Sequence, residues 1–157
     1  DDEVLLQGPQ GQRVLPLSAF LVDYFTTALA GDELLVEIRV PALPAAMQGR
    51  YVRHLRTAAE HRPLVTLAVL LQWSGTRCSA ARIALGAAAP VALRLPSAEA
   101  LLVGRTPDAA LVTQVADHIA ASIDPLSDQR GSADYRRDIV RVLVQRTLAD
   151  LCHLPPE

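Results

Sequence analysis

The hydrophobic pattern in the first two thirds of the chain is that of β-strands. In residues 32–41, aliphatic side chains occupy every second position, which predicts a half-buried strand that stops at Pro41. Residues 63–73 and 77–86 are aliphatic and β-branched runs separated by the turn sequence SGT, so we expect a hairpin with two largely buried strands. Residues 89–96 give a further short strand.

Farther along the chain, the apolar positions recur with the period of an α-helix. Ser97 can cap a short helix. A second helix is expected over residues 106–121, with Thr106 as its cap and a proline at its first position. In the sequence RGSADYRRDIVRVLVQRTL, Ser132 is the expected N-cap of a last helix, and Asp134 lies near the positive end of that helix's dipole.

Strands followed by helices favour an α+β domain. We expect an antiparallel sheet of three or four strands, followed by about three helices whose apolar stripes cover one face of the sheet. The sheet is expected to consist mainly of residues 33–41, 63–73, 77–87 and 90–95, with helices near 108–121 and 133–151.

Composition narrows the classes of partner. The 157 residues are 50% hydrophobic, which is enough for one packed domain, and the net charge of −2 gives no reason to expect nucleic acid or an anionic membrane. No apolar run approaches the roughly 20 residues that span a bilayer. Cys78 and Cys152 stand alone, without metal-ligand spacing. We therefore expect a cytoplasmic protein without a metal site. Because the chain begins without methionine, we also expect it to be cut from a longer polypeptide.

No self-contained active site is visible in the sequence. The motifs GxSxG and GxGxxG and the P-loop are absent. The unusual stretch is residues 49–62, where Tyr51, Arg53 and Arg56 project from an extended segment. Alternation puts Tyr51 and Arg53 on one face, where an aromatic ring and a guanidinium could contact a planar ligand or a phosphate. An edge strand guarded by charge is the competing interpretation.

The sequence DQRGSADYRR, residues 128–137, completes a series of five stretches. LPLSAFLVDYFTTALAGDELLVEIRVP, YVRHLR, ARIALGAAAPVALR and EALLVGR precede it in that order. Together they resemble the FAD-binding subunits of molybdenum hydroxylases, the xanthine dehydrogenase and carbon monoxide dehydrogenase medium-subunit family. That family shows DxRGSAEYRR, YxKxxR and ARIALGGVAPTPxR at the corresponding places, and the resemblance covers roughly residues 13–150.

The resemblance implies a place in an electron-transfer chain. In that family an N-terminal FAD-binding portion precedes a C-terminal α+β domain, so residues 1–17 are expected to be the remnant of the upstream portion and residues 18–157 the C-terminal domain. The family's flavin takes electrons from iron–sulfur clusters, which received them from a molybdopterin site, and passes them to NAD or another acceptor. The alternative is a stand-alone interaction module of the same fold without flavin.

The resemblance also implies cofactors, partners and site residues. We expect FAD in the full-length subunit, with the upstream portion and the iron–sulfur and molybdopterin subunits as partners. No FAD is expected to bind tightly to this chain alone, because the glycine-rich diphosphate loops are missing. Tyr51, Arg53 and Arg56 are the implied cofactor-binding residues, and Arg53 stands where the family has a lysine near the flavin edge. Tyr135 and Arg136 are expected to anchor the start of the last helix against the sheet.

Overall fold

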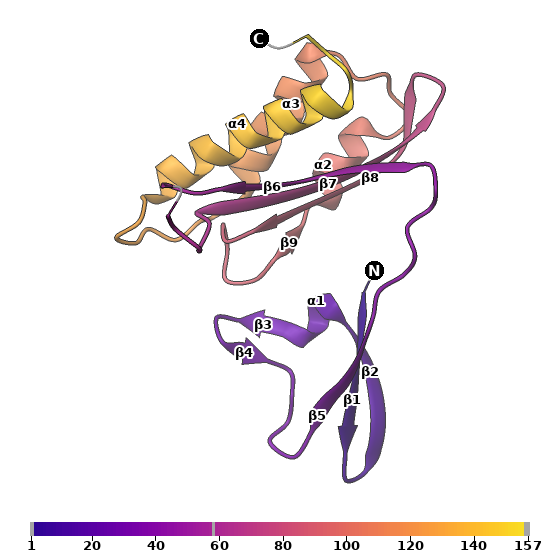
Figure 1. The fold of residues 1–157 in the computed structure, drawn as a ribbon, viewed down its shortest axis with the longest axis vertical. Coiled ribbons are helices and arrows are strands. Elements are labelled where there is room, and N and C mark those ends of the chain that lie inside the picture. The colour runs from indigo at the N-terminus through magenta and orange to yellow at the C-terminus, as the bar shows by residue number, and fades with distance from the viewer. Residues whose placement is uncertain (1, 58, 156–157) are drawn as a thin grey trace. The chain divides into compact units, whose positions relative to one another are not determined.

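Figure 1 shows the computed structural model, which describes residues 2–57 and 59–155. The chain divides into two compact units, one ending at Pro44 and the other beginning at Ala45. The boundary expected between residues 17 and 18 lies inside the first unit.

The first unit is built around a small antiparallel sheet. Its elements are β1 (Glu3–Gly8), β2 (Gly11–Pro16), α1 (Leu17–Phe20), β3 (Leu21–Asp23), β4 (Thr26–Thr27) and β5 (Leu34–Arg39). The sheet has the strand order β2-β1-β5, and β3 pairs separately with β4. Val4, Leu6 and Phe20 form the core of this unit.

Strand β5 is the segment that the alternating pattern assigned to the main sheet, and that prediction was wrong. The strand pairs with β1, so that Leu34 lies opposite Gln7 and Ile38 opposite Val4. All six of its residues are exposed, so the strand is not half-buried either. Alternation shows that a strand has two different faces, but it does not specify which strand lies beside it or what covers either face.

The second unit is α+β, as expected. Its elements are β6 (Met47–His54), β7 (Val65–Ser74), β8 (Arg77–Gly86), β9 (Leu93–Arg94), α2 (Pro96–Leu102), α3 (Ala109–Ser122) and α4 (Ala133–Leu151). Each strand pairs antiparallel with the next along the chain, giving the order β6-β7-β8-β9. Strand β6 therefore takes the place in the sheet that was expected for the 33–41 segment.

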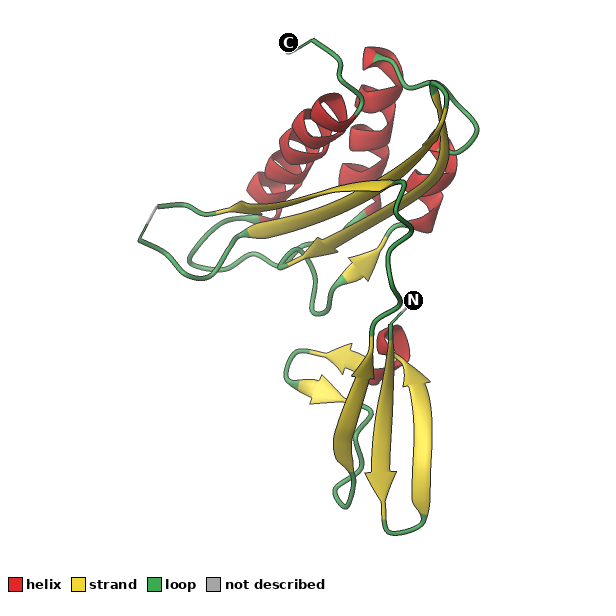
Figure 2. Ribbon diagram, turned by 45° about the vertical axis from the view of Figure 1, so that its right-hand side comes forward, coloured by secondary structure: helices red, strands yellow, loops and turns green. Residues whose placement is uncertain are grey.

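Helices α2, α3 and α4 share one core with one face of the sheet, and Figure 2 shows them on that face. Along β7 the buried positions alternate with half-buried ones, so one face of the strand is covered and the other is not. The strands contribute Val65, Leu67, Val69, Leu71, Ile83 and Leu85 to this core, and the helices contribute Leu102, Val115, Ile119, Val140, Val144 and Leu148. Within the described residues, no helix combines the length and the apolar character needed to cross a membrane.

The helix starts agree only in part with the expected caps. Ser132 caps α4, and its hydroxyl accepts a hydrogen bond at 3.1 Å from the amide three residues on. The cap of α3 is Asp108 and not Thr106, because the extended backbone of Asp108 directs its carboxylate to an amide of the first turn at 2.8 Å. Helix α2 begins with proline at its first position and without a side-chain cap, so the role expected for Ser97 was wrong.

The residue after β8, Ala87, has a left-handed backbone with φ of 61°. This conformation costs a residue with a Cβ atom about 1–2 kcal/mol. The family pattern GGVAP quoted above has glycine at this position, where this chain has alanine.

Replacing Ala87 by glycine should therefore raise the free energy of unfolding by about 0.5–1 kcal/mol. Urea unfolding followed by the fluorescence of Trp73, the single tryptophan, measures this change. The matched control is Ala88→Gly, which should lower stability because Ala88 is buried and lacks a positive φ. A destabilised Ala87→Gly variant would contradict the strain assigned to this position.

Candidate functional site

Tyr51 and Arg53 project from β6, the outer strand of the four-stranded sheet. The register places Tyr51 opposite Ala68 and Arg53 opposite Thr66. Successive side chains of a strand point to opposite faces. Because Leu67 is buried in the helix-covered core, its neighbours Thr66 and Ala68 belong to the other face. The prediction that Tyr51 and Arg53 share a face is confirmed, and it is the face that the helices leave open.

Small residues lie beside Tyr51 on this open face. A Cβ atom on Gly49 would lie 2.4 Å from Cδ2 of Leu70, and one on Gly86 would lie 2.5 Å from Oγ1 of Thr66. The side chains of Leu70 and Thr66 thus occupy the space that glycine leaves, and alanines occupy the positions opposite Tyr51 on the next two strands. The Tyr51 side chain is 64% exposed above this surface, so its ring is accessible to a planar group.

Arg53 is held in place without being neutralised. Its Nη2 donates a hydrogen bond to the carbonyl oxygen of His61 at 2.7 Å, and it forms no ion pair with a described residue. The other N–H groups of the guanidinium therefore remain available to an acceptor. The residues that β6, β7 and β8 direct to the open face by register include Arg53 and Arg82 but no acid.

Arg56 lies beyond the end of β6 and belongs to the loop that connects it to β7. Its Nη2 lies 3.2 Å from Oε1 of Glu60, and its backbone N–H donates to Oε2 of the same carboxylate at 3.3 Å. The structure therefore brings Tyr51 and Arg53 together on the sheet and places Arg56 in the adjoining loop with an acidic partner.

The DQRGSADYRR sequence supports this loop through Arg136, which is 4% exposed. Its Nη1 donates to the carbonyl oxygens of Leu64 at 2.7 Å and Ala87 at 3.2 Å. Its Nη2 donates to Oδ2 of Asp128 at 2.9 Å. The start of α4 is thus bound to the residue that precedes β7 and to the residue that follows β8. The anchoring role expected for Arg136 is confirmed.

The carboxylate of Asp128 accepts several hydrogen bonds. Its Oδ1 accepts the backbone N–H groups of Arg130 at 2.9 Å and Gly131 at 3.1 Å, while its Oδ2 accepts from Arg136. These hydrogen bonds, that of the Arg130 amide first, hold the pKa of Asp128 below its usual value.

Arg130 also contacts the loop between β6 and β7. Its Nη2 donates to the carbonyl oxygen of Arg62 and lies 3.4 Å from Oε2 of Glu60. The Glu60 carboxylate therefore pairs with both Arg56 and Arg130, and its role is structural. The contact between Arg130 and Glu60 joins residues 70 positions apart, so no local pattern in the sequence predicts it.

The ring of Tyr135 packs closely against Gly131, where a side chain would be crowded. A Cβ atom on Gly131 would lie 3.2 Å from Cδ1 of Tyr135. The tyrosine ring also meets the ring of His54 edge-on, with a centroid distance of 6.5 Å. Because His54 ends β6, this contact joins α4 to the strand that carries Tyr51 and Arg53.

Other chemistry is not supported by the described residues. Among residues 2–57 and 59–155, no group of three or more His, Cys, Asp or Glu side chains could hold a metal ion. Burial raises the pKa of both thiols, that of Cys152 to about 11, so neither is an activated nucleophile.

The chemistry of Tyr51 and Arg53 is compatible with a planar ring such as that of a flavin, whereas the described residues show no anchor for the diphosphate of a dinucleotide. Tyr51 offers an exposed ring beside small residues, and Arg53 on the same face offers further donors. A diphosphate is usually held by a glycine-rich turn or a helix N-terminus. The starts of α3 and α4 carry Asp108 and Asp134, which repel phosphate.

The family model for the CO dehydrogenase flavoprotein C-terminal domain matches residues 50–151. The carbon monoxide dehydrogenase medium chain of Hydrogenophaga pseudoflava is 34% identical over 144 residues, which cover 92% of this chain and 50% of the relative. The 6-hydroxypseudooxynicotine dehydrogenase complex subunit alpha of Paenarthrobacter nicotinovorans is 30% identical over 153 residues, covering 98% of this chain and 52% of the relative.

Solved structures agree with these relatives. A carbon monoxide dehydrogenase structure from Hydrogenophaga pseudoflava superimposes with a TM-score of 0.87 and 36% identity, covering 94% of this chain and 51% of that one. The chain thus spans about half the length of the curated relatives it matches. The family model covers nearly all of the second unit, including the sheet, the loop after β6 and the buried Arg136. This chain belongs to the family of CO dehydrogenase flavoprotein C-terminal domains.

Proposed function

We propose that this chain is the C-terminal part of the FAD-containing electron-transfer subunit of a molybdopterin-dependent dehydrogenase. The observation that carries the proposal is the exposed pair of Tyr51 and Arg53 on an acid-free sheet face. The protein passes electrons from iron–sulfur clusters through FAD to an acceptor, and its partners are the iron–sulfur and molybdopterin subunits. The relatives named above are themselves subunits of larger enzymes.

The two residues have different roles in this proposal. When bound, FAD supplies reversible uptake of electrons. The Tyr51 ring would contact the flavin ring, and the Arg53 guanidinium would supply a positive charge near it that stabilises the negative charge that reduction brings. Arg56 adds a weaker contribution from the loop, because Glu60 offsets its charge.

The DQRGSADYRR sequence acts on this site by positioning it. Arg136 and Arg130 bind carbonyl groups at the end of the loop after β6, and Arg53 binds a carbonyl group within it. The loop therefore links the anchor in α4 to the guanidinium on the sheet. We assign Asp128 and Arg136 to support of this loop and not to contact with the cofactor.

The first unit belongs with the upstream FAD-binding portion in this proposal. The compact unit ends at Pro44 and the family match begins at residue 50, so the portion expected to end at residue 17 extends to residue 44. The exposed apolar residues of β5, among them Leu34 and Ile38, then face the rest of that portion.

Replacing Arg53 by alanine in the full-length subunit, within its complex, should lower the flavin midpoint potential. Loss of about 1–2 kcal/mol of charge stabilisation corresponds to about 20–40 mV for a two-electron couple. A spectroelectrochemical titration measures the shift. Arg53→Lys should keep most of the potential because it keeps the charge. Arg62→Ala, which removes an exposed arginine of the same loop, should leave the potential unchanged. If Arg53→Ala leaves the flavin potential unaltered, Arg53 is a solvated charge on an edge strand, and the flavin-free interaction module is favoured.

Replacing Asp128 by asparagine should destabilise the second unit by about 1.5–3 kcal/mol, the usual value for a hydrogen bond to a charged group. The control Asp124→Asn should change stability by no more than about 0.5 kcal/mol, because the Asp124 side chain is 98% exposed in its pair with Arg137.

The effect of Asp128→Asn should depend on pH with a defined sign. The folded-state pKa of Asp128 is lowered, so its contribution is present above the unfolded pKa of about 4 and is lost as the pH falls through the folded value. The stability difference from the unsubstituted chain should therefore shrink in acid. Urea midpoints measured between neutral and acidic pH check this, and a difference that grows toward acid would rule out the assignment.

Purified alone, this chain should not retain FAD. The Tyr51 and Arg53 side chains meet only the ring, and a ring contact without a diphosphate anchor is weak. The measurement is the flavin absorbance of the chain after it is mixed with FAD and then dialysed. A stoichiometric yellow protein after dialysis would make this chain a flavin-binding unit in its own right.

A further inference from the structure

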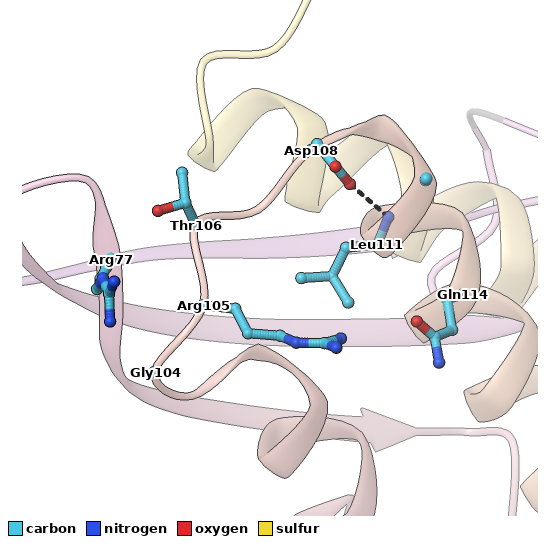
Figure 3. A pocket seen from close by; sticks show the side chains of 8 residues that line it. Arg77, Gly104, Arg105, Thr106, Asp108, Leu111 and Gln114 are labelled. Carbon is cyan, nitrogen blue, oxygen red and sulfur yellow. Dashed lines mark hydrogen bonds between the residues drawn. The ribbon is translucent and has the colours of Figure 1, made fainter.

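A polar pocket lies at the end of the sheet where β7 turns into β8. Its volume is about 450 Å³, and the start of β8, the loop after α2 and the first turns of α3 line it. Figure 3 shows the Arg105 side chain extending from that loop toward Gln114 of α3, with Arg77 beside the loop. Its size falls within the range of about 300–1,000 Å³ that is typical of small-ligand sites.

The pocket is separate from the proposed flavin-contacting residues. Arg53 pairs with Thr66 near the start of β7, whereas Arg77 pairs with Ser74 at its end. Eight residues of extended strand separate these two positions, which corresponds to about 26 Å. The pocket therefore has no part in the proposed electron transfer at the open face.

The two arginines of the pocket carry unbalanced charge. Most arginines of the chain form ion pairs, such as Arg141 with Asp117 at 2.8 Å. In contrast, neither guanidinium of the pocket has an ion pair or a side-chain hydrogen bond with a described residue. The one acid that lines the pocket, Asp108, accepts the amide of Leu111 at 2.8 Å. A bound anion would balance this charge.

The backbone around the pocket is fixed before any ligand arrives. The N–H of Gly104 donates to the carbonyl oxygen of Cys78 at 2.7 Å, and the N–H of Cys78 donates to the carbonyl oxygen of Arg105 at 2.8 Å. Gly104 has φ of 82°, a backbone conformation that favours glycine. These bonds hold the backbones of Arg105 and Arg77 close together, so rotation of the two exposed side chains is enough to bring both guanidinium groups to one ligand.

We propose that this pocket binds the phosphate group of a small ligand, with Arg105 and Arg77 as donors to its oxygens. A guanidinium presents a planar fork of N–H groups that matches phosphate geometry. A phosphate dianion can engage two such forks, whereas a single carboxylate is well matched by one. The amide of Gln114 and the hydroxyl of Thr106 add neutral donors to the pocket wall.

Titration of the full chain with inorganic phosphate tests this proposal. Backbone amide signals are followed by NMR while sodium chloride keeps the ionic strength constant. The signals of Gly104, Arg105 and Gln114 should shift together and saturate with one dissociation constant. Arg105→Gln should weaken binding about tenfold or more, because it removes a bidentate charged contact. Arg77→Gln should also weaken phosphate binding when it is the only substitution.

The control is Arg146→Gln, which removes an exposed arginine of α4 that has no described ion pair and should leave phosphate binding unchanged. Succinate should bind more weakly than phosphate in the unsubstituted chain. Both pocket arginines are exposed, so the spectra of the free variants should retain the dispersion of the folded chain. Shifts that fail to saturate, that chloride reproduces, or that survive in both Arg105→Gln and Arg77→Gln would overturn the proposal, as would an equal loss in Arg146→Gln.

Discussion

The buried guanidinium of Arg136 joins three separate parts of the second unit. It extends from the first turn of α4 and binds the carbonyl oxygens of Leu64 and Ala87, with Asp128 as its charged partner. A buried cation is costly unless it is paired and hydrogen-bonded. Nη1 and Nη2 of Arg136 are bonded, whereas its buried Nε has no partner among the described residues, so separating the strand ends from the helix start would leave further buried donors without partners. One of the two carbonyl groups that Arg136 binds belongs to Ala87, the residue with the left-handed backbone.

The open face of the sheet depends on this arrangement. The helices occupy one face of β7 and β8, and β6 extends the sheet beyond its two buried strands. An outer strand with one free face can display Tyr51 and Arg53 while its other face contributes to packing. The loop that follows β6 is held by Arg130 and Arg136, and it in turn holds the Arg53 side chain. The site is therefore a surface of the fold more than a cavity in it.

The two ends of β7 differ in their electrostatic character. At one end, the Glu60 carboxylate pairs with both Arg56 and Arg130, so each of these guanidinium groups has an acidic partner. At the other end, Arg77 and Arg105 line a pocket in which Asp108, the acid among the described lining residues, caps a helix. The open face between them displays Arg53 and Arg82 by register without an acid. Positive charge that is left unpaired on a rigid surface is available to an anionic ligand.

The sequence by itself determined the α+β class, the buried hairpin, the helix positions and the cap at Ser132, because strand alternation, helical period and capping act over a few neighbouring residues. It also placed Tyr51 and Arg53 on one face, since that follows from the period of a strand. Only the tertiary structure decided that residues 34–39 pair with β1 and that β6 completes the main sheet. The contact of Arg130 with Glu60 and the pairing of Gly104 with Cys78 were decided there as well. Strand partners and ion pairs between distant segments depend on which surfaces meet when the chain collapses, and no local pattern of residues encodes that choice.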